Sequence, residues 1–239
     1  MTQLIKLEIL RVLRNRRYLF FTVIYPVALY ALMVGAYSGA TELGGVAVKT
    51  YFMISMATFG TVGASLNAAM RISLERKSGW TRQLRLTALP GSSYVTAKLV
   101  ASGVTTLPAI IGVFLLGAVE GVRFSAGAWI GTAAILWVGG FVFAALGVAL
   151  GYAAAPDSVQ PIVMITYMLM AMAGGTWFRM PDSIQKYFDW TPMALYNQLG
   201  RLALPHVHVT SGRVLALAVY LVVFTYFAAR LYQRDRKAA

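Results

Sequence analysis

Residues 124–156 read FSAGAWIGTAAILWVGGFVFAALGVALGYAAAP, and no charged side chain interrupts them. A helix needs about 20 apolar residues to cross a hydrocarbon core of about 30 Å. Two crossings would need about 40 residues, so this run predicts one long, tilted transmembrane helix.

Similar charge-free segments lie on both sides of this run. They cover residues 18–41, 50–70, 99–119, 158–178 and 214–229. The last is short, but Arg213 and Arg230 at its two ends can extend their charges toward water. The pattern predicts an all-α membrane protein with six transmembrane helices, at about 18–38, 51–70, 94–119, 127–154, 158–178 and 212–232.

The composition excludes a soluble globular protein. Hydrophobic residues make up 59% of the 239 residues, and charged residues make up 12%, about half of what a soluble domain carries. The chain has no cysteine, which excludes disulfides and thiolate metal sites. The first apolar segment is too long for a cleavable signal peptide, so we expect a retained anchor.

The basic residues are distributed unequally between the two sides of the predicted membrane. With the N-terminus inside, 15 of the 21 lysines and arginines lie on the inner side, while the eight acidic residues divide evenly. The positive-inside rule therefore predicts a cytoplasmic membrane protein with both termini in the cytoplasm. The net charge of +13 then serves orientation and attraction to anionic lipid, and no nucleic-acid-binding motif accompanies it.

The remaining segments complete a single transmembrane domain over residues 1–239. Residues 2–17 mix apolar and basic side chains and predict an interfacial helix on the inner leaflet. Two pairs of small residues, Gly60 with Ala64 and Gly147 with Gly151, have the spacing of close helix contacts. We expect these contacts within one subunit rather than at a dimer interface.

The cytoplasmic loop 71–93 contains the pattern of a short amphipathic helix. Trp80, Leu84 and Ala88 recur at helical spacing, whereas Arg82 and Arg85 point to another side. Pro90-Gly91 then ends this helix. The loop therefore offers a small helix at the membrane surface, and a basic connector that binds lipid remains an alternative.

The outer segment 179–211 has three prolines and two apolar stretches that are too short to cross the membrane. These stretches, about 183–190 and 193–204, carry aromatic residues typical of a membrane interface. We expect two short re-entrant helices that enter the outer leaflet and return.

No catalytic, cofactor-binding or metal-binding constellation is evident. The chain lacks a GxxxxGK[ST] phosphate-binding loop and an HExxH motif. Its two histidines, His206 and His208, have no third strong metal ligand beside them. We expect polar residues inside the spans, such as Asn67, Thr106 and Tyr167, to form hydrogen bonds between helices, although some could line a substrate path.

In two places the sequence resembles the permease subunits of type-2 ATP-binding-cassette exporters. The first is Glu75-Arg76-Lys77-Ser78-Gly79, followed by Leu84, Leu86, Pro90 and Lys98. The second is Gly174-Gly175-Thr176-Trp177-Phe178, followed by Pro181, Ile184, Trp190-Thr191-Pro192, Tyr196 and Arg201-Leu202. The six-span layout agrees as well. Thr191, where many members have Asn or Leu, and the short outer loop 39–50 depart from the family pattern.

The resemblance implies how this chain is energised and assembled. The helix at 80–89 would couple to a separate cytoplasmic ATPase that binds ATP and Mg, so this chain would be a transporter subunit without a cofactor. The residues implied in this coupling are Glu75, Arg76, Gly79, Trp80, Arg82, Leu84 and Arg85. Two permeases, identical or paralogous, would join two ATPases.

The resemblance also implies an outer gate and a class of substrate. The gate residues would be Trp177, Phe178, Pro181, Trp190, Pro192 and Tyr196. Members of the family carry drugs, lipids, peptides and polysaccharide precursors. Among these, the apolar lining expected of the path favours an amphiphile, such as a drug, a lipid or a peptide-like compound. A membrane sensor or immunity protein that does not transport, and an ion-coupled carrier, remain alternatives.

Overall fold

A computed structural model describes residues 2–43, 45–79, 91–178, 181–202, 204 and 209–238. Its helices and strands are α1 (Thr2–Leu13), α2 (Arg16–Ala36), β1 (Glu42–Leu43), β2 (Val46–Ala47), α3 (Val48–Lys77), α5 (Gly91–Val119), α6 (Ala126–Ala153), α7 (Val159–Ala173), α8 (Asp182–Phe188), α9 (Pro192–Gly200) and α10 (Ser211–Ala238). The prediction of an all-α membrane protein is confirmed, apart from a hairpin of two short strands that the sequence pattern did not indicate.

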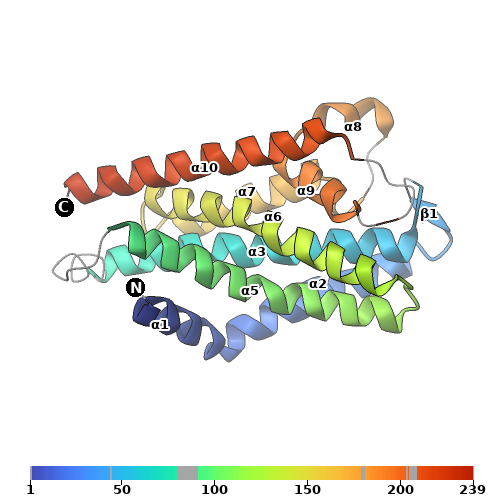
Figure 1. The fold of residues 1–239 in the computed structure, drawn as a ribbon, viewed down its shortest axis with the longest axis horizontal. Helices are drawn as coiled ribbons and strands as arrows, with labels where there is room; N and C mark the ends of the chain where they lie inside the picture. Colours follow the sequence, from blue (N-terminus) through green and yellow to red (C-terminus); the bar gives the residue numbers. More distant parts are fainter. Residues whose placement is uncertain are drawn as a thin grey trace.

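The helices form one elongated bundle (Figure 1). Both chain termini lie at one end of it, which we call the terminal end. The β1–β2 hairpin, α8 and α9 lie at the opposite end, which we call the hairpin end. The predicted placement of both termini on one side therefore agrees with the fold.

Five described helices are long and apolar enough to cross a membrane: α2, α3, α5, α6 and α10. The expected fifth span, 158–178, contains α7, which ends earlier at Ala173 and has 15 residues. At 1.5 Å per residue it is about 22 Å long, shorter than the hydrocarbon core. The count of six spans therefore stays a prediction.

Helix α3 is the centre of the bundle and is almost entirely buried. It packs against α2, α5, α6, α7 and α9, and α10 runs along the far side of α6 (Figure 1). Two glycines of α6 allow its backbone to approach that of α3. A Cβ on Gly147 would lie 2.8 Å from the carbonyl oxygen of Ser65, and a Cβ on Gly151 would lie 3.0 Å from that of Ala69. The contact of these two glycines within one chain is as expected.

The interfacial segment is divided into two helices. α1 ends at Leu13, and the side chain of Asn15 accepts a hydrogen bond from the backbone N–H of Tyr18 at 3.0 Å, which caps the start of α2. The expected helix over 2–17 is therefore shorter, and its last residues already belong to the first long helix.

Candidate functional site

Three consecutive charged residues, Glu75, Arg76 and Lys77, end α3 at the terminal end of the bundle. Successive residues of an α-helix are rotated by about 100° around its axis, so their side chains point in three directions. Each binds a different part of the fold. We call these three residues with their partners the three-way anchor.

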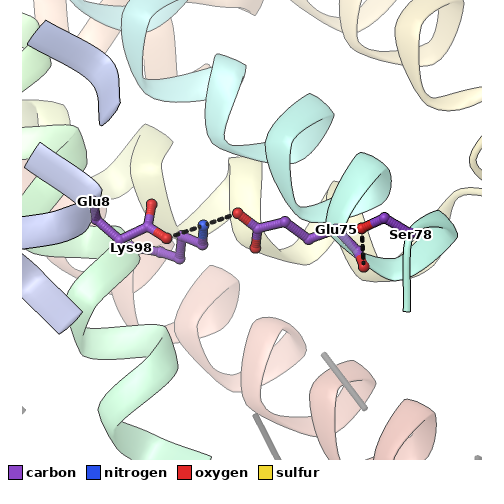
Figure 2. A network of polar contacts seen from close by, with 4 residues as sticks. All are labelled: Glu8, Glu75, Ser78 and Lys98. Carbon is purple, nitrogen blue, oxygen red and sulfur yellow. Dashed lines mark hydrogen bonds and ion pairs between the residues drawn. The ribbon is translucent and has the colours of Figure 1, made fainter. Parts of the chain in front are cut away.

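Glu75 belongs to a buried ion triad (Figure 2). The Lys98 Nζ atom lies 2.6 Å from Glu75 Oε1 and 2.8 Å from Glu8 Oε1. All three side chains are buried, and that of Lys98 is only 1% exposed. A buried charge is tolerated when it is paired and hydrogen-bonded. The triad therefore ties α1 and α5 to the end of α3.

Arg76 makes the second connection. Its Nη2 atom lies 2.8 Å from Asp235 Oδ1 in α10, and its Nη1 donates to the carbonyl oxygens of Gly151 at 3.0 Å and Ala154 at 3.1 Å. Gly151 lies in the last turn of α6 and Ala154 is its C-cap residue, so a cation here is favoured by the helix dipole. Arg76 thus joins α3 to α6 and to the C-terminal helix.

Lys77 makes the third connection, on the surface. Its Nζ atom lies 2.8 Å from Asp157 Oδ1, in the turn between α6 and α7. The hydrogen bond from Lys77 and its positive charge lower the pKa of Asp157 below the ordinary value. Helix α3 ends at Lys77, and Gly79, two residues later, has a φ of +73° that suits glycine.

The predicted coupling residues divide into two groups. Glu75, Arg76 and Gly79 lie at the end of α3, whereas Trp80, Arg82, Leu84 and Arg85 lie outside the described residues, as does the expected helix at 80–89. The Glu75 carboxylate faces inward to Lys98, so within this chain its partner is a lysine of α5. Sequence reasoning missed Glu8, although it is the only acidic residue in segment 2–17.

At the hairpin end, α9 inserts between α3, α6 and α7. The Tyr196 O–H donates to the Leu136 carbonyl of α6, and Asn197 donates to the Gly174 carbonyl after α7 at 3.0 Å. Just after α9, Arg201 donates to Ser55 Oγ at 3.1 Å and lies 4.0 Å from the centre of the Tyr51 ring. This short helix and the residue after it therefore connect α3, α6 and the end of α7 at the hairpin end of the bundle.

The predicted gate residues differ in burial and in the elements that hold them. Tyr196 is fully buried, and the half-buried Trp177 ring lies 5.6 Å from that of Phe59. Phe178 and Trp190 are exposed. Pro181 precedes α8, and Pro192 opens α9 behind the capping side chain of Thr191. Neither Asn197 nor Arg201 was among the site residues predicted from the sequence, although Arg201 stands in the family-like motif.

A groove of about 600 Å³ lies between α2, α3 and α7. Its walls are mainly apolar and include Phe21, Pro26, Gly60 and Met164, with Tyr18, Asn15 and Asn67 toward the terminal end. The volume is typical of a small-molecule site. Of the polar residues expected to join helices, Tyr167 does so, donating to the Phe59 carbonyl at 2.7 Å, whereas Asn67 and Thr106 bond within their own helices.

Comparison with known proteins agrees with this architecture. The chain is 28% identical over 222 residues to the transport permease YvfS of Bacillus subtilis (strain 168), across 91% of this chain and 90% of that protein. The ABC-2 type transporter family matches residues 1–200, which include α9 and all of the three-way anchor except Asp235. A family match over most of the chain, together with the apolar helical bundle, makes this protein a member of the ABC-2 type transporter family, a membrane transport permease.

Proposed function

We propose that this permease is the membrane subunit of an ATP-driven exporter whose ATPase is a separate cytoplasmic protein. The terminal end would face the cytoplasm, in agreement with the distribution of basic residues. Two copies, or this chain and a paralogue, would join two ATPases in the cytoplasmic membrane.

The three-way anchor is the observation that carries this proposal. It lies directly before residues 80–89, the segment where an ATPase is expected to dock. The anchor fixes the preceding helix end to α1, α5, α6 and α10 through Lys98, Glu8 and Asp235. A force applied to this segment would therefore act on the bundle as a rigid body rather than on one loop.

The chain itself supplies no means to hydrolyse ATP by the common phosphate-loop route, since it lacks the GxxxxGK[ST] motif. ATP and Mg would therefore bind to the partner. The groove between α2, α3 and α7 suits an amphiphilic substrate, and α9 with the aromatic residues near it would close the outer side.

The first experiment is purification of the tagged chain from its native membrane in mild detergent, followed by mass spectrometry of the copurifying proteins. We expect an ATPase with a phosphate-binding loop, at about one copy per permease. Extraction that preserves other known membrane complexes but yields no ATPase would contradict the proposal.

Reconstitution then tests the docking segment. With the ATPase added, the double variant R82E/R85E should lose ATP-dependent transport, while R123E/K186E, on exposed residues of the hairpin end, should retain it. Transport driven by an ion gradient without the ATPase would favour a carrier instead. Ligand binding without any transport would favour a sensor.

A further inference from the structure

The groove between α2, α3 and α7 is polar at one end and apolar at the other. Asn15 and Asn67 line it toward the terminal end, whereas Pro26 and Gly60 line it deeper in the bundle. About 10 Å of α3 separates Asn67 from Gly60, at 1.5 Å per residue. A ligand that matches this groove would have a polar head and an apolar tail.

Arg71 gives the polar end a positive charge. Arg71 lies just behind the lining rather than in it. It is one helical turn beyond Asn67, and its guanidinium carbon is 5.9 Å from the centre of the ring of Tyr18, which lines the groove. Its Nε and Nη1 atoms are buried and have no hydrogen-bond partner among the described residues. A buried N–H without an acceptor is unfavourable, and more so on a charged group.

The surroundings increase this positive character. The exposed residues Arg14 and Arg16 flank Asn15 at the same end. The acidic residue nearest to Arg71 on the same helix, Glu75, is bound to Lys98. The charge at this end of the groove is therefore complementary to an anion.

We propose that the groove binds an anionic amphiphile as the transported substrate, with its oxyanion head at Arg71 and its tail along α3 toward Pro26 and Gly60. Planar guanidinium groups bind carboxylate and phosphate oxygens in a two-point geometry. The substrate assignment rests on the function proposed above, whereas the binding itself can be measured without an ATPase or transport.

The absence of cysteine from the chain allows a site-specific probe. Met164 and its neighbour Ile165 on α7 are both exposed, but only Met164 lines the groove. M164C and I165C would each carry an environment-sensitive fluorophore in nanodiscs of phosphatidylcholine. The I165C protein reports partitioning of a ligand into the bilayer, and M164C reports occupancy of the groove in addition.

Dodecyl phosphate and dodecyltrimethylammonium share a tail and differ in the charge of the head. We expect dodecyl phosphate to shift the fluorescence of labelled M164C at concentrations at least tenfold lower than dodecyltrimethylammonium does. Labelled I165C should show only the change that comes from partitioning of the ligand into the bilayer. Adding R71Q to M164C should weaken the response to dodecyl phosphate at least tenfold. R234Q, which removes an exposed arginine on α10, should not weaken it.

Equal responses to the anion and the cation in M164C would overturn the proposal, and this comparison stands even if R71Q does not fold. An unchanged response in folded R71Q would overturn the role of Arg71. If phosphatidylglycerol in the nanodisc, at the mole fraction of dodecyl phosphate, abolishes its response, the groove is a membrane-lipid site and the substrate assignment is wrong. None of these outcomes depends on whether an ATPase joins the permease.

Discussion

Lys98 is central to the contacts of the terminal end, because its ammonium group lies between two buried carboxylates. Its distances to Glu8 and Glu75 are those of charge-assisted hydrogen bonds. Removal of the ammonium group would take from both buried carboxylates the ion pair that each makes with Lys98.

We expect Lys98→Met to lower the free energy of unfolding by about 3–5 kcal/mol, the usual cost when one partner of a buried ion pair is removed. The measurement is thermal or denaturant unfolding in detergent. Lys49→Gln is the control, because Lys49 and its partner Glu120 are 48% and 37% exposed and such surface pairs contribute about 0–1 kcal/mol. Similar losses of unfolding free energy in the two variants would show that the buried triad stabilises the protein no more than a surface ion pair does.

Gly139 is a second residue whose size matters, since the Tyr196 ring occupies the space beside it. A Cβ on Gly139 would lie 2.5 Å from Tyr196 Cε2. Gly139→Ala should therefore displace the tyrosine from the Leu136 carbonyl and destabilise the protein by about 1–3 kcal/mol.

Gly127→Ala is the matched control for this prediction. A Cβ there meets only Ser125 Oγ at 4.0 Å, and alanine is the better helix former by about 1 kcal/mol. The melting temperature should fall for Gly139→Ala and stay level or rise for Gly127→Ala. A fall of the same size in both variants would contradict the assigned role of Tyr196.

These residue contacts could be predicted from the sequence only in part. Glu75 and Lys98 stood out as members of family-like motifs, but their pairing could not be deduced. Glu8 lies 90 residues before Lys98, and nothing local links them. The pairing becomes visible only when the ends of α1, α3 and α5 meet in the folded bundle.

At the scale of elements, the turn between α6 and α7 is held to α3 by a surface ion pair whose strength depends on pH. The pKa of Asp157 is lowered below its ordinary value of 3.8 by Lys77. The stabilising contribution of a carboxyl with a lowered pKa is present above the ordinary pKa and is lost as the pH falls through the lowered one.

Spin labels at Ser78→Cys and Ser158→Cys would measure this contact in a chain that has no other cysteine. We expect the distribution of distances between the labels to stay constant from pH 7 down to about pH 4, near the ordinary pKa of an aspartate. The distribution should broaden only below that pH. Asp157→Asn should show no pH dependence over this range. Broadening that begins near pH 6 would contradict the assignment to Asp157.

The bounds of α6 were predictable because charge and hydrophobicity mark the membrane limits, whereas α3 continues past the expected residue 70 to Lys77. α6 begins at Ala126 and ends at Ala153, close to the expected 127–154. α7 was expected to reach residue 178 but ends at Ala173, before Gly174 and Gly175, the latter at a φ of +61°. The hairpin of β1 and β2 has strands of two residues, too short for an alternating pattern to reveal.

At the scale of the whole molecule, the ion pair of Arg76 with Asp235 connects two residues that are 159 positions apart in the sequence. We expect Arg76→Asp and Asp235→Arg each to reduce ATP-dependent transport at least fivefold, because α10 would no longer move with the end of α3. The double exchange R76D/D235R should recover part of the transport, though not the hydrogen bonds from Arg76 to the carbonyls of α6. Transport assays in vesicles with the ATPase present would measure this.

Failure of the double exchange to improve on the single variants would show that Arg76 acts through α6 alone. A loss of transport could also come from a loss of stability, so the melting temperature of each variant should first be compared with that of the unmodified protein. Only variants that fold normally and lose transport bear on the connection between α3 and α10.

The central position of α3 also constrains how the protein is made. It is the least hydrophobic of the five long described helices, yet it is the one most hidden from lipid. During synthesis it reaches the translocon before α5 and α6, the neighbours that later cover it. A marginal segment partitions poorly into lipid by itself, so we expect nascent α3 to stay beside the translocon or an insertion chaperone until α5 and α6 emerge and the three leave together.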